Sequence, residues 1–441
     1  METNNGKPMT AEILKKKVKE IERIGGLINA PQWLIDELKT PKRVLKMGIR
    51  ASVGGKQTLL TAIRVHHRNP FATGARPYKG GTRYHPGVTE ELLTVLAMDM
   101  TEKCALAGLP FGGAKGGIAL DPSICTEAEL RNITEQMVME MLKDNIPHPD
   151  IDVPGPDVGT NPTTMYWMYV KVAEMNHFRN IPNATAVVTG KPVEHDGIPG
   201  REDATSHGLL IQLKEFLKIA KPKLSLLPTM VVQGFGNVGA NVARLAEDDR
   251  FNFLVTAVSD VSGGLYNPTG LDMKKVQAWY KKNGSLAGYS EAEKVTNQEL
   301  LELEADILVP AAIENQITEK NASRIRARMI TEGANEAITA EANAILFDRG
   351  IPVIPGIAAN VGGVVVSYLE WRRNRGERKH RVDFDDEREW VSMELTKIMH
   401  GVIQSVHAKS EELKCSLPDA AHILATETIR DLLKKKHSYV D

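Results

Sequence analysis

Apolar residues recur along this chain with two different periods, and together they predict an α/β protein. Between Leu59 and His66 apolar and polar residues alternate, the pattern of a strand with one buried face. The segments from Ala11 to Leu38 and from Ala204 to Lys218 instead suit helices. After Gly117, a further short strand is expected to begin at Ile118. Helices and strands therefore follow one another in the predicted fold.

Capping residues mark two helix starts in the first half of the chain. Thr89 precedes two glutamates, an acidic start that suits a helix N-terminus. Thr126 is followed three residues later by Glu129, the signature of a capping box, which predicts a helix that reaches about Lys143. The helix that begins after Thr89 is expected to run towards Gly108.

Short apolar runs alternate with helical segments in the second half. The first run, from Pro228 to Gln233, precedes a glycine-rich turn, a predicted helix from Ala240 to Glu247 and a second run from Phe253 to Val258. Further runs lie at residues 306–309, 328–331 and 352–354. This alternation predicts a Rossmann-like, doubly wound parallel sheet with helices on both faces.

A stretch rich in glycine and proline, Gly190 to Gly200, is interpreted as a linker between domains. We therefore expect a first α/β domain over residues 1–190 and a dinucleotide-binding domain over residues 191–359. The helices predicted over residues 360–441 are expected to pack back on the first domain.

Composition excludes several classes of protein. The 441 residues carry a formal net charge of -1, which argues against a general binder of nucleic acids or of membrane surfaces. Cys104, Cys125 and Cys415 are scattered, so they predict neither a disulfide framework nor a metal site and suit a cytoplasmic setting. The sequence shows neither a targeting segment nor an apolar stretch of membrane-spanning length.

Three lysines between Pro77 and Gly117 indicate a site for an anion. Lys79 and Lys115 each stand beside double glycines, which serve close backbone contact or a positive φ. Lys103 falls on the same helical stripe as two leucines, so it points towards apolar surroundings. A single lysine of this kind is more often a structural ion pair, but three together favour a binding site.

An aspartate on a proline-rich segment is the candidate proton carrier. Residues 147–159 contain four prolines, which exclude a helix and predict a loop that presents Asp150, Asp152 and Asp157. A loop aspartate commonly just forms a turn. If it reaches Lys115, however, Asp157 could exchange protons beside the amine.

A second glycine-rich turn carries the fingerprint of a dinucleotide site. The residues are Gly234, Phe235, Gly236, Asn237, Val238 and Gly239. They follow a strand, open a helix and precede a second strand that ends at Asp260, an acid suited to a ribose hydroxyl. A structural tight turn is the alternative, but the agreement of strand, turn, helix and acid favours the dinucleotide.

Ser367 lies in a helix expected after the glycine-rich turn at residues 359–363. It could simply bond to the backbone of its own helix. If the helix returns to the first domain, the hydroxyl becomes a possible ligand for a substrate oxygen.

Five motifs taken together resemble the hexameric glutamate dehydrogenases of the glutamate/leucine/phenylalanine/valine dehydrogenase superfamily, over nearly the whole chain. They are Pro77-Tyr-Lys-Gly-Gly-Thr-Arg-Tyr-His-Pro, Leu109-Pro-Phe-Gly-Gly-Ala-Lys-Gly-Gly, Pro156-Asp-Val-Gly-Thr, Gly234-Phe-Gly-Asn-Val-Gly and Asn360-Val-Gly-Gly-Val-Val-Val-Ser. The resemblance implies reversible oxidative deamination of L-glutamate to 2-oxoglutarate and ammonia, with NAD or NADP as cofactor, by a homohexamer whose first domain binds substrate and supports oligomerisation.

The resemblance also implies a role for each candidate. Lys115 is expected to be the catalytic lysine and Asp157 the proton-transfer acid/base. Lys103 would bind the α-carboxylate, and Lys79 with Ser367 the side-chain carboxylate. Thr205 and Asn335 match positions that contact the nicotinamide half of the cofactor.

Two points stay open from the sequence. Asp260 favours NAD over NADP because an aspartate repels a 2′-phosphate, although Lys274 and Lys275 could offset that charge. Ser206 and Glu336 depart from the family pattern near the expected cofactor site. A catalytically poor regulatory or cofactor-binding subunit of the same fold is therefore the alternative function.

Overall fold

The computed structural model describes residues 7–71, 76–176, 180–377 and 384–437. Contacts divide the chain into two compact units. The first consists of Met1–Arg201, Val366–Val391 and Ala425–Asp441, and the second of Glu202–Val365 and Ser392–Leu424. Each of the three C-terminal helices therefore contributes residues to both units. These helices are α12 (Gly362–Asn374), α13 (Phe384–Leu413) and α14 (Leu417–His437).

This grouping differs from the expected division in the C-terminal region. The helices of residues 360–441 were expected to pack on the first domain, whereas Ser392–Leu424 groups with the second unit. Within that unit Gln404 of α13 donates to Glu215 of α6, with 2.6 Å between Nε2 and Oε1. Met399 of α13 also packs against Gly208 of α6 (Ala204–Ala220), where a β-carbon would lie 3.0 Å from Met399 Cε. Local periodicity does not reveal such contacts.

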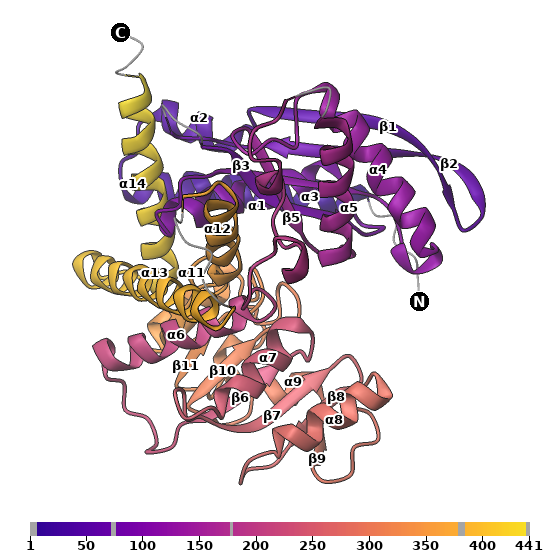
Figure 1. The fold of residues 1–441 in the computed structure, drawn as a ribbon. Coiled ribbons are helices and arrows are strands. Elements are labelled where there is room, and N and C mark those ends of the chain that lie inside the picture. The colour runs from indigo at the N-terminus through magenta and orange to yellow at the C-terminus, as the bar shows by residue number, and fades with distance from the viewer. Residues whose placement is uncertain (1–6, 72–75, 177–179, 378–383, 438–441) are drawn as a thin grey trace. The chain divides into compact units, whose positions relative to one another are not determined.

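The described part of the first unit contains a five-stranded sheet in the order β1-β2-β4-β3-β5 (Figure 1). Its strands are β1 (Arg43–Val53), β2 (Lys56–His66), β3 (Tyr78–Tyr84), β4 (Gly112–Ile118) and β5 (Asp152–Pro156). Its helices are α1 (Lys7–Leu27), α2 (Gln32–Lys39), α3 (Glu90–Leu106), α4 (Glu127–Lys143) and α5 (Pro162–Asn176), besides the parts of α12 to α14. β2 pairs antiparallel with β1 and β4, while β3 pairs parallel with β4 and β5.

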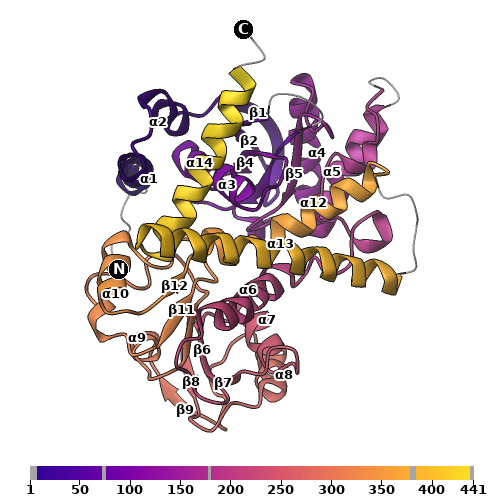
Figure 2. The same ribbon diagram turned by 90° about the vertical axis from the view of Figure 1, so that its left-hand side faces the viewer.

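Helices cover both faces of this sheet. On one face, Leu60 and Ala62 of β2 pack with residues of α4 and α5, including Ile133 and Met165. On the other face Val65 packs against Leu93 of α3. Behind α3, apolar residues of α1, α2 and α14 form a further cluster, and Figure 2 shows α14 beside α3.

The segment predicted to be helical, Ala11 to Leu38, is interrupted once. It consists of α1 and α2, and the break occurs where Asn29 adopts a φ of 49° ahead of Pro31. Proline cannot donate to the preceding turn, so it begins a new helix instead of continuing the first. The two predicted caps are confirmed: Thr89 accepts from Leu92 N, and Thr126 with Glu129 forms the capping box of α4.

The described part of the second unit contains a seven-stranded sheet in the order β12-β11-β10-β6-β7-β8-β9. The strands are β6 (Thr229–Gln233), β7 (Leu254–Asp260), β8 (Gly263–Tyr266), β9 (Glu293–Val295), β10 (Ile307–Pro310), β11 (Met329–Thr331) and β12 (Val353–Ile354). The helices are α6, α7 (Asn237–Ala246), α8 (Met273–Asn283), α9 (Asn297–Leu301), α10 (Ala340–Asp348) and α11 (Gly356–Ala359), besides parts of α12 to α14.

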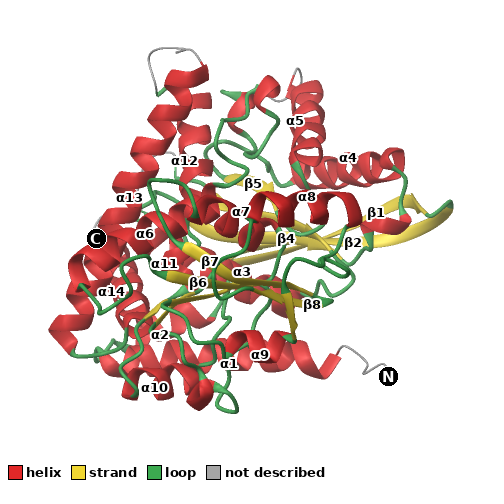
Figure 3. Ribbon diagram, turned by 90° about the horizontal axis from the view of Figure 1, so that it is seen from below, coloured by secondary structure: helices red, strands yellow, loops and turns green. Residues whose placement is uncertain are grey.

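This sheet is doubly wound, as predicted, but not wholly parallel. β12 through β7 are parallel, whereas β8 and β9 were not expected and add an antiparallel edge. Figure 3 shows α7 and α9 on opposite sides of the strands. Because the chain goes from β6 to β7 on one side and later returns to β10 on the other, the strand order reverses at β6, where such sheets bind ligands.

No helix in the part of the chain that the structure describes is long and apolar enough to cross a membrane.

Candidate active site

Strand alternation brings three of the basic residues in this region to one face of the first sheet. In the parallel pair of β3 and β4, Lys79 lies opposite Gly113 and Arg83 opposite Gly117. Lys115 lies midway between these two glycines, so it shares their face. Lys79, Arg83 and Lys115 therefore project together towards α3, which packs on that face.

The double glycines around these lysines belong to strands, not to loops. The short strand expected after Gly117 in fact ends at Ile118, because β4 comprises the glycine-rich motif itself. None of its glycines has a positive φ. Instead they permit close approach: a β-carbon on Gly113 would lie 2.2 Å from Thr101 Oγ1 of α3. Of the two expected reasons for these glycines, close contact is the one that applies.

Lys115 and Asp157 form an ion pair beside Arg83. Asp157 follows the C-terminal end of β5, and its Oδ2 lies 3.1 Å from Lys115 Nζ and 2.8 Å from Arg83 Nε. Gly81 gives the carboxylate room, since a β-carbon there would stand 2.8 Å from Asp157 Cβ. Burial alone would raise the pKa of Asp157, but the charges of Lys115 and Arg83 lower it to about 2.

Asp152 does not lie on a loop, contrary to the prediction. It begins β5 and is fully buried, where Arg64 binds both carboxylate oxygens and His66 Nε2 lies 2.9 Å from Oδ2. Burial acts to raise the pKa of Asp152, but the charges of Arg64 and His66 hold it far below its usual range. Arg64 also donates to the carbonyls of Gly80 and Gly81, each at 3.2 Å. The second predicted loop aspartate, Asp150, pairs with Arg375.

Lys79 is a buried ammonium group that forms no ion pair with any described residue. Burial, followed by the charges of Arg201 and Arg64, lowers the pKa of Lys79 to about 7. A β-carbon on Gly155 of β5 would stand 2.9 Å from Lys79 Nζ and 3.4 Å from Thr189 Oγ1. The glycine thus leaves open the space beside both groups, which suits an anionic ligand.

Lys103 and Ser367 belong to the helices around this face. Lys103, in the last turn of α3, is half-buried, as are the two leucines on its stripe, Leu92 and Leu96. Burial raises the pKa of the neighbouring Cys104 thiol to about 12, while the charges of Lys79 and Lys103 both act to lower it. Ser367, on α12, is buried and belongs to the same unit.

Sequence reasoning missed two residues of this site. Arg83 stands two and four positions after Gly81 and Lys79, so strand periodicity would have found it had the motif been interpreted as a strand. Thr189 is fully buried, and its Oγ1 has no hydrogen-bond partner among the described residues. No local pattern singles out Thr189, because only the pairing of its backbone with β5 brings it to the site: Thr189 N donates to Pro154 O at 3.0 Å.

In the second unit, the three glycines of the motif that joins β6 to the first turn of α7 have different steric surroundings. Gly234 turns the chain with a φ of 92°, and a β-carbon there would lie 2.8 Å from Ala312. Gly239 faces Gly234 O so closely that its β-carbon would stand 1.9 Å away. Gly236, in contrast, has nothing within 4 Å of its β-carbon position, so this point of the turn is open. Tight turn, open approach and close helix packing are the three roles of a dinucleotide fingerprint, so these residues fit a pyrophosphate.

The remaining candidates of the second unit surround this turn or lie at other strand ends. Asp260 ends β7, where its carboxylate accepts from Ser262 N and Leu286 N, both at 2.7 Å. Burial would raise the pKa of Asp260, but these bonds and those from the Ser262 and Ser285 hydroxyls hold it below its usual range. Asn335 is exposed after β11, and its Oδ1 accepts from Asn360 at 2.7 Å.

Thr205 stands in the first turn of α6, next to one of the departures from the family pattern. That departure, Ser206, donates its hydroxyl to Val238 O at 2.9 Å. It therefore links α6 to the glycine turn. The other departure, Glu336, adopts a φ of 48°.

No cluster of three or more histidine, cysteine, aspartate or glutamate side chains in the described residues is arranged to hold a metal ion. All three cysteines are unpaired.

Comparison with known proteins gives consistent matches over nearly the whole chain. Residues 197–436 match the family Glutamate/Leucine/Phenylalanine/Valine dehydrogenase, and residues 41–174 match Glu/Leu/Phe/Val dehydrogenase, dimerisation domain. The chain is 39% identical over 426 residues to the glutamate dehydrogenase of Thermotoga maritima, covering 96% of this chain and 97% of that protein.

Relatives specific for each dinucleotide match at similar levels. The chain is 38% identical to the NADP-specific glutamate dehydrogenase of Saccharolobus shibatae, covering 83% of this chain and 84% of the relative. It is 36% identical to the NAD-specific glutamate dehydrogenase A of Halobacterium salinarum, covering 94% and 91%.

Solved structures match as well. The hetero-hexameric glutamate dehydrogenase from Thermus thermophilus, in a leucine-bound form, has a TM-score of 0.84 at 31% identity over 97% of both chains. The glutamate dehydrogenase from Peptoniphilus asaccharolyticus has a TM-score of 0.80 at 30% identity, covering 96% of this chain and 99% of that one.

Proposed function

This chain belongs to the glutamate/leucine/phenylalanine/valine dehydrogenase family, and from that premise we propose that it catalyses the reversible oxidative deamination of L-glutamate to 2-oxoglutarate and ammonia. The choice of glutamate rests on Lys79, a buried ammonium group without an acidic partner among the described residues. A leucine, valine or phenylalanine side chain would leave this charge uncompensated, whereas the second carboxylate of glutamate pairs with it.

The substrate carboxylates are assigned to different lysines. Lys79, Ser367 and Thr189 bind the side-chain carboxylate, and Lys103 binds the α-carboxylate. This arrangement is supported by the position of Thr189 beside Lys79 and by the proximity of Lys79 and Lys103 to Cys104. Two fixed charges at the two ends of one dicarboxylate orient its Cα for reaction.

Lys115 and Asp157 carry the proton transfers. The nicotinamide cofactor, when bound, would supply the hydride acceptor for Cα of glutamate, so that loss of a proton from the substrate's amino group would leave an imine. Lys115 then holds and activates the water that attacks the imine carbon, and Asp157 takes up and returns the protons that free ammonia. The 3.1 Å ion pair between them supports a direct exchange. Arg83 keeps the carboxylate oriented throughout.

The cofactor is NAD or NADP, held by Gly234, Phe235, Gly236, Asn237, Val238 and Gly239 with Asp260, Thr205 and Asn335. We favour NAD because Asp260 is an anion at the end of β7, where a ribose hydroxyl can donate to it. A homohexamer and a cytoplasmic location complete the proposal. Three unpaired cysteines support the location, and the hexameric relative supports a hexamer, although that protein is hetero-hexameric.

The direct test is turnover of the purified protein with L-glutamate and each dinucleotide at limiting concentration, followed by the absorbance of reduced nicotinamide. We expect turnover with glutamate and a higher kcat/KM with NAD. Absence of turnover with both dinucleotides would contradict the enzyme and favour a cofactor-binding or regulatory subunit. A higher kcat/KM with NADP would overturn only the assignment of Asp260.

Replacing Gly236 by alanine is expected to weaken dinucleotide binding without loss of thermal stability. The new methyl group meets no protein atom, but it stands at the open approach to the turn. We expect affinity to fall about tenfold or more, as when one or two backbone bonds to phosphate are lost. Isothermal titration with each dinucleotide measures this.

The matched control for this variant is Gly401→Ala on α13, where a β-carbon also meets nothing within 4 Å. It should leave dinucleotide affinity unchanged. Equal affinities for Gly236→Ala and the unaltered protein would remove the pyrophosphate from this turn.

A further inference from the structure

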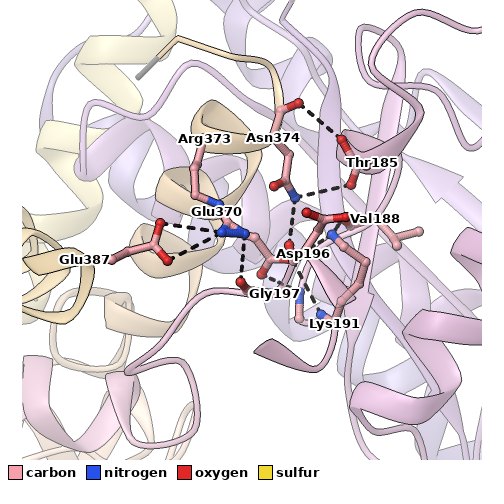
Figure 4. Close-up of polar contacts among 10 residues, drawn as sticks. Thr185, Val188, Lys191, Asp196, Gly197, Glu370, Arg373, Asn374 and Glu387 are labelled. Atoms are coloured by element: carbon pink, nitrogen blue, oxygen red, sulfur yellow. Dashed lines mark hydrogen bonds and ion pairs between the residues drawn. The ribbon is translucent and has the colours of Figure 1, made fainter. Parts of the chain in front are cut away.

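A buried ion pair lies next to the proposed side-chain carboxylate site but outside it. Lys191 Nζ lies 2.8 Å from Glu370 Oε1, and both side chains are completely buried. Lys191 Nζ also donates to Val188 O at 3.0 Å (Figure 4). Taking two charges out of water is costly, so the pair needs compensating contacts.

Glu370 supplies those contacts by binding the chain segment that contains Thr189. Its Oε2 accepts from Gly190 N at 2.7 Å, and its Oε1 also accepts from Lys191 N at 3.5 Å. On the other side of the segment, Thr189 N donates to Pro154 O of β5. Thr189 is therefore held between β5 and a single carboxylate of α12.

The same helix carries Ser367, one turn before Glu370, so the two side chains share a side of α12. Farther along α12, Arg373 Nη2 donates to Gly197 O at 2.9 Å, and Asn374 Nδ2 donates to Asp196 O at 3.0 Å (Figure 4). One face of α12 is thus bound to residues 185–197 over little more than one turn, from Glu370 to Asn374. These bonds hold the part of α12 that follows Ser367 against the segment that contains Thr189.

The charge of Glu370 also acts on Lys79. It opposes the effect of Arg201 and Arg64, which both disfavour the ammonium form of Lys79. All three groups assigned to the side-chain carboxylate are therefore linked to Glu370. Thr189 and Ser367 are linked to it through the backbone, and Lys79 through the electrostatic effect of its charge.

We propose that Glu370, paired with Lys191, is a positioning residue that sets Thr189 and Ser367 around Lys79 and so determines recognition of the substrate's second carboxylate. The inference rests on the proposed function, since it concerns the same proposed site for the side-chain carboxylate of glutamate. Glu370 itself does not touch the substrate. It acts through the segment and the helix that it joins.

Two variants are needed for the test. Glu370→Gln keeps an acceptor for Gly190 N but leaves the Lys191 charge buried without its partner, so this protein could fail to fold. The double variant Lys191→Met with Glu370→Gln removes both charges and retains that acceptor. Glu387→Gln is the matched control, because Glu387 pairs with Arg373 at 3.4 Å in the same cluster without contacting residues 188–191.

The readout compares 2-oxoglutarate with 2-oxopentanoate, in which a methyl group replaces the second carboxylate, in the reductive direction at saturating ammonium. For the double variant we expect KM for 2-oxoglutarate to rise about tenfold, as expected when supporting contacts to a binding group are lost. Its kcat and its kcat/KM for 2-oxopentanoate should change less than about threefold. Glu387→Gln should leave both substrates unaffected.

Equal losses for the two substrates would make Glu370 a stability residue and overturn the proposal, as would an unchanged KM for 2-oxoglutarate. Failure of the proposed function is a separate result: the unaltered protein would then not turn over 2-oxoglutarate at all.

Discussion

Replacing Lys115 by methionine is expected to lower kcat for glutamate by about three orders of magnitude, as for the loss of a general acid/base group. Methionine keeps most of the length of the side chain but has no amine to hold and activate water. Asp157 remains anchored by Arg83 at 2.8 Å, so the rest of the site keeps its geometry. Steady-state turnover with saturating glutamate and dinucleotide measures the effect.

Binding should survive in this variant, since Lys115 is assigned to neither carboxylate. The dissociation constant of glutarate, a dicarboxylate that cannot react, is therefore expected to change less than about threefold. Lys143→Met is the control, because Lys143 is an exposed lysine on α4 that pairs with Glu140. A kcat within tenfold of the unaltered value would exclude Lys115 as the catalytic lysine.

Replacing Lys79 by leucine is expected to lower kcat/KM for glutamate by about a thousandfold, the scale of losing one partner of a buried charge pair. The side-chain carboxylate would then enter a buried site whose nearest cation is gone. Arg64 cannot replace it, because Asp152 and two backbone carbonyls already occupy its guanidinium group. Unchanged turnover of glutamate in this variant would remove the argument for a dicarboxylate substrate.

The pH dependence of ligand binding gives the same variant a second readout. The pKa of Lys79 is lowered to about 7, so its charge is present below that pH and is lost as the pH rises through it. Glutarate should therefore bind the unaltered protein most tightly below pH 7 and more weakly above it, by up to about tenfold per pH unit, with uptake of one proton. Lys79→Leu should show neither the pH dependence nor the proton uptake, which titration calorimetry in two buffers would reveal.

Local sequence was sufficient wherever the interaction itself is local. The capping box at Thr126 and the cap at Thr89 each join residues three positions apart, and both are present. The motif from Gly234 to Gly239 is equally local: Gly234 and Gly239 leave no room for a β-carbon, whereas Gly236 is open. Short apolar runs separated by helical segments likewise predicted β6, β7, β10, β11 and β12. A parallel strand that is buried on both faces can be recognised from its own sequence, because it is a continuous apolar run.

Motifs dominated by glycine and proline were harder to interpret, because those residues usually mark turns. β4 consists of glycine, alanine, lysine and isoleucine, yet it is the central strand between β2 and β3. β5 contains two prolines and begins at Asp152, whose burial depends on Arg64 from β2. These strands exist because their neighbours supply hydrogen bonds and close packing, which override local propensity.

The sequence by itself determined the family, the glycine fingerprint, and which lysines and which aspartate are candidates for the active site. Only the tertiary structure decided that Lys79 is buried without an acidic partner in the part of the chain that the structure describes. It also decided that Asp157 pairs with both Lys115 and Arg83, and that Thr189 stands beside Lys79. The reason is physical. Burial and charge pairing arise from strands and helices far apart in sequence, and the register that joins them is set by packing of the whole unit.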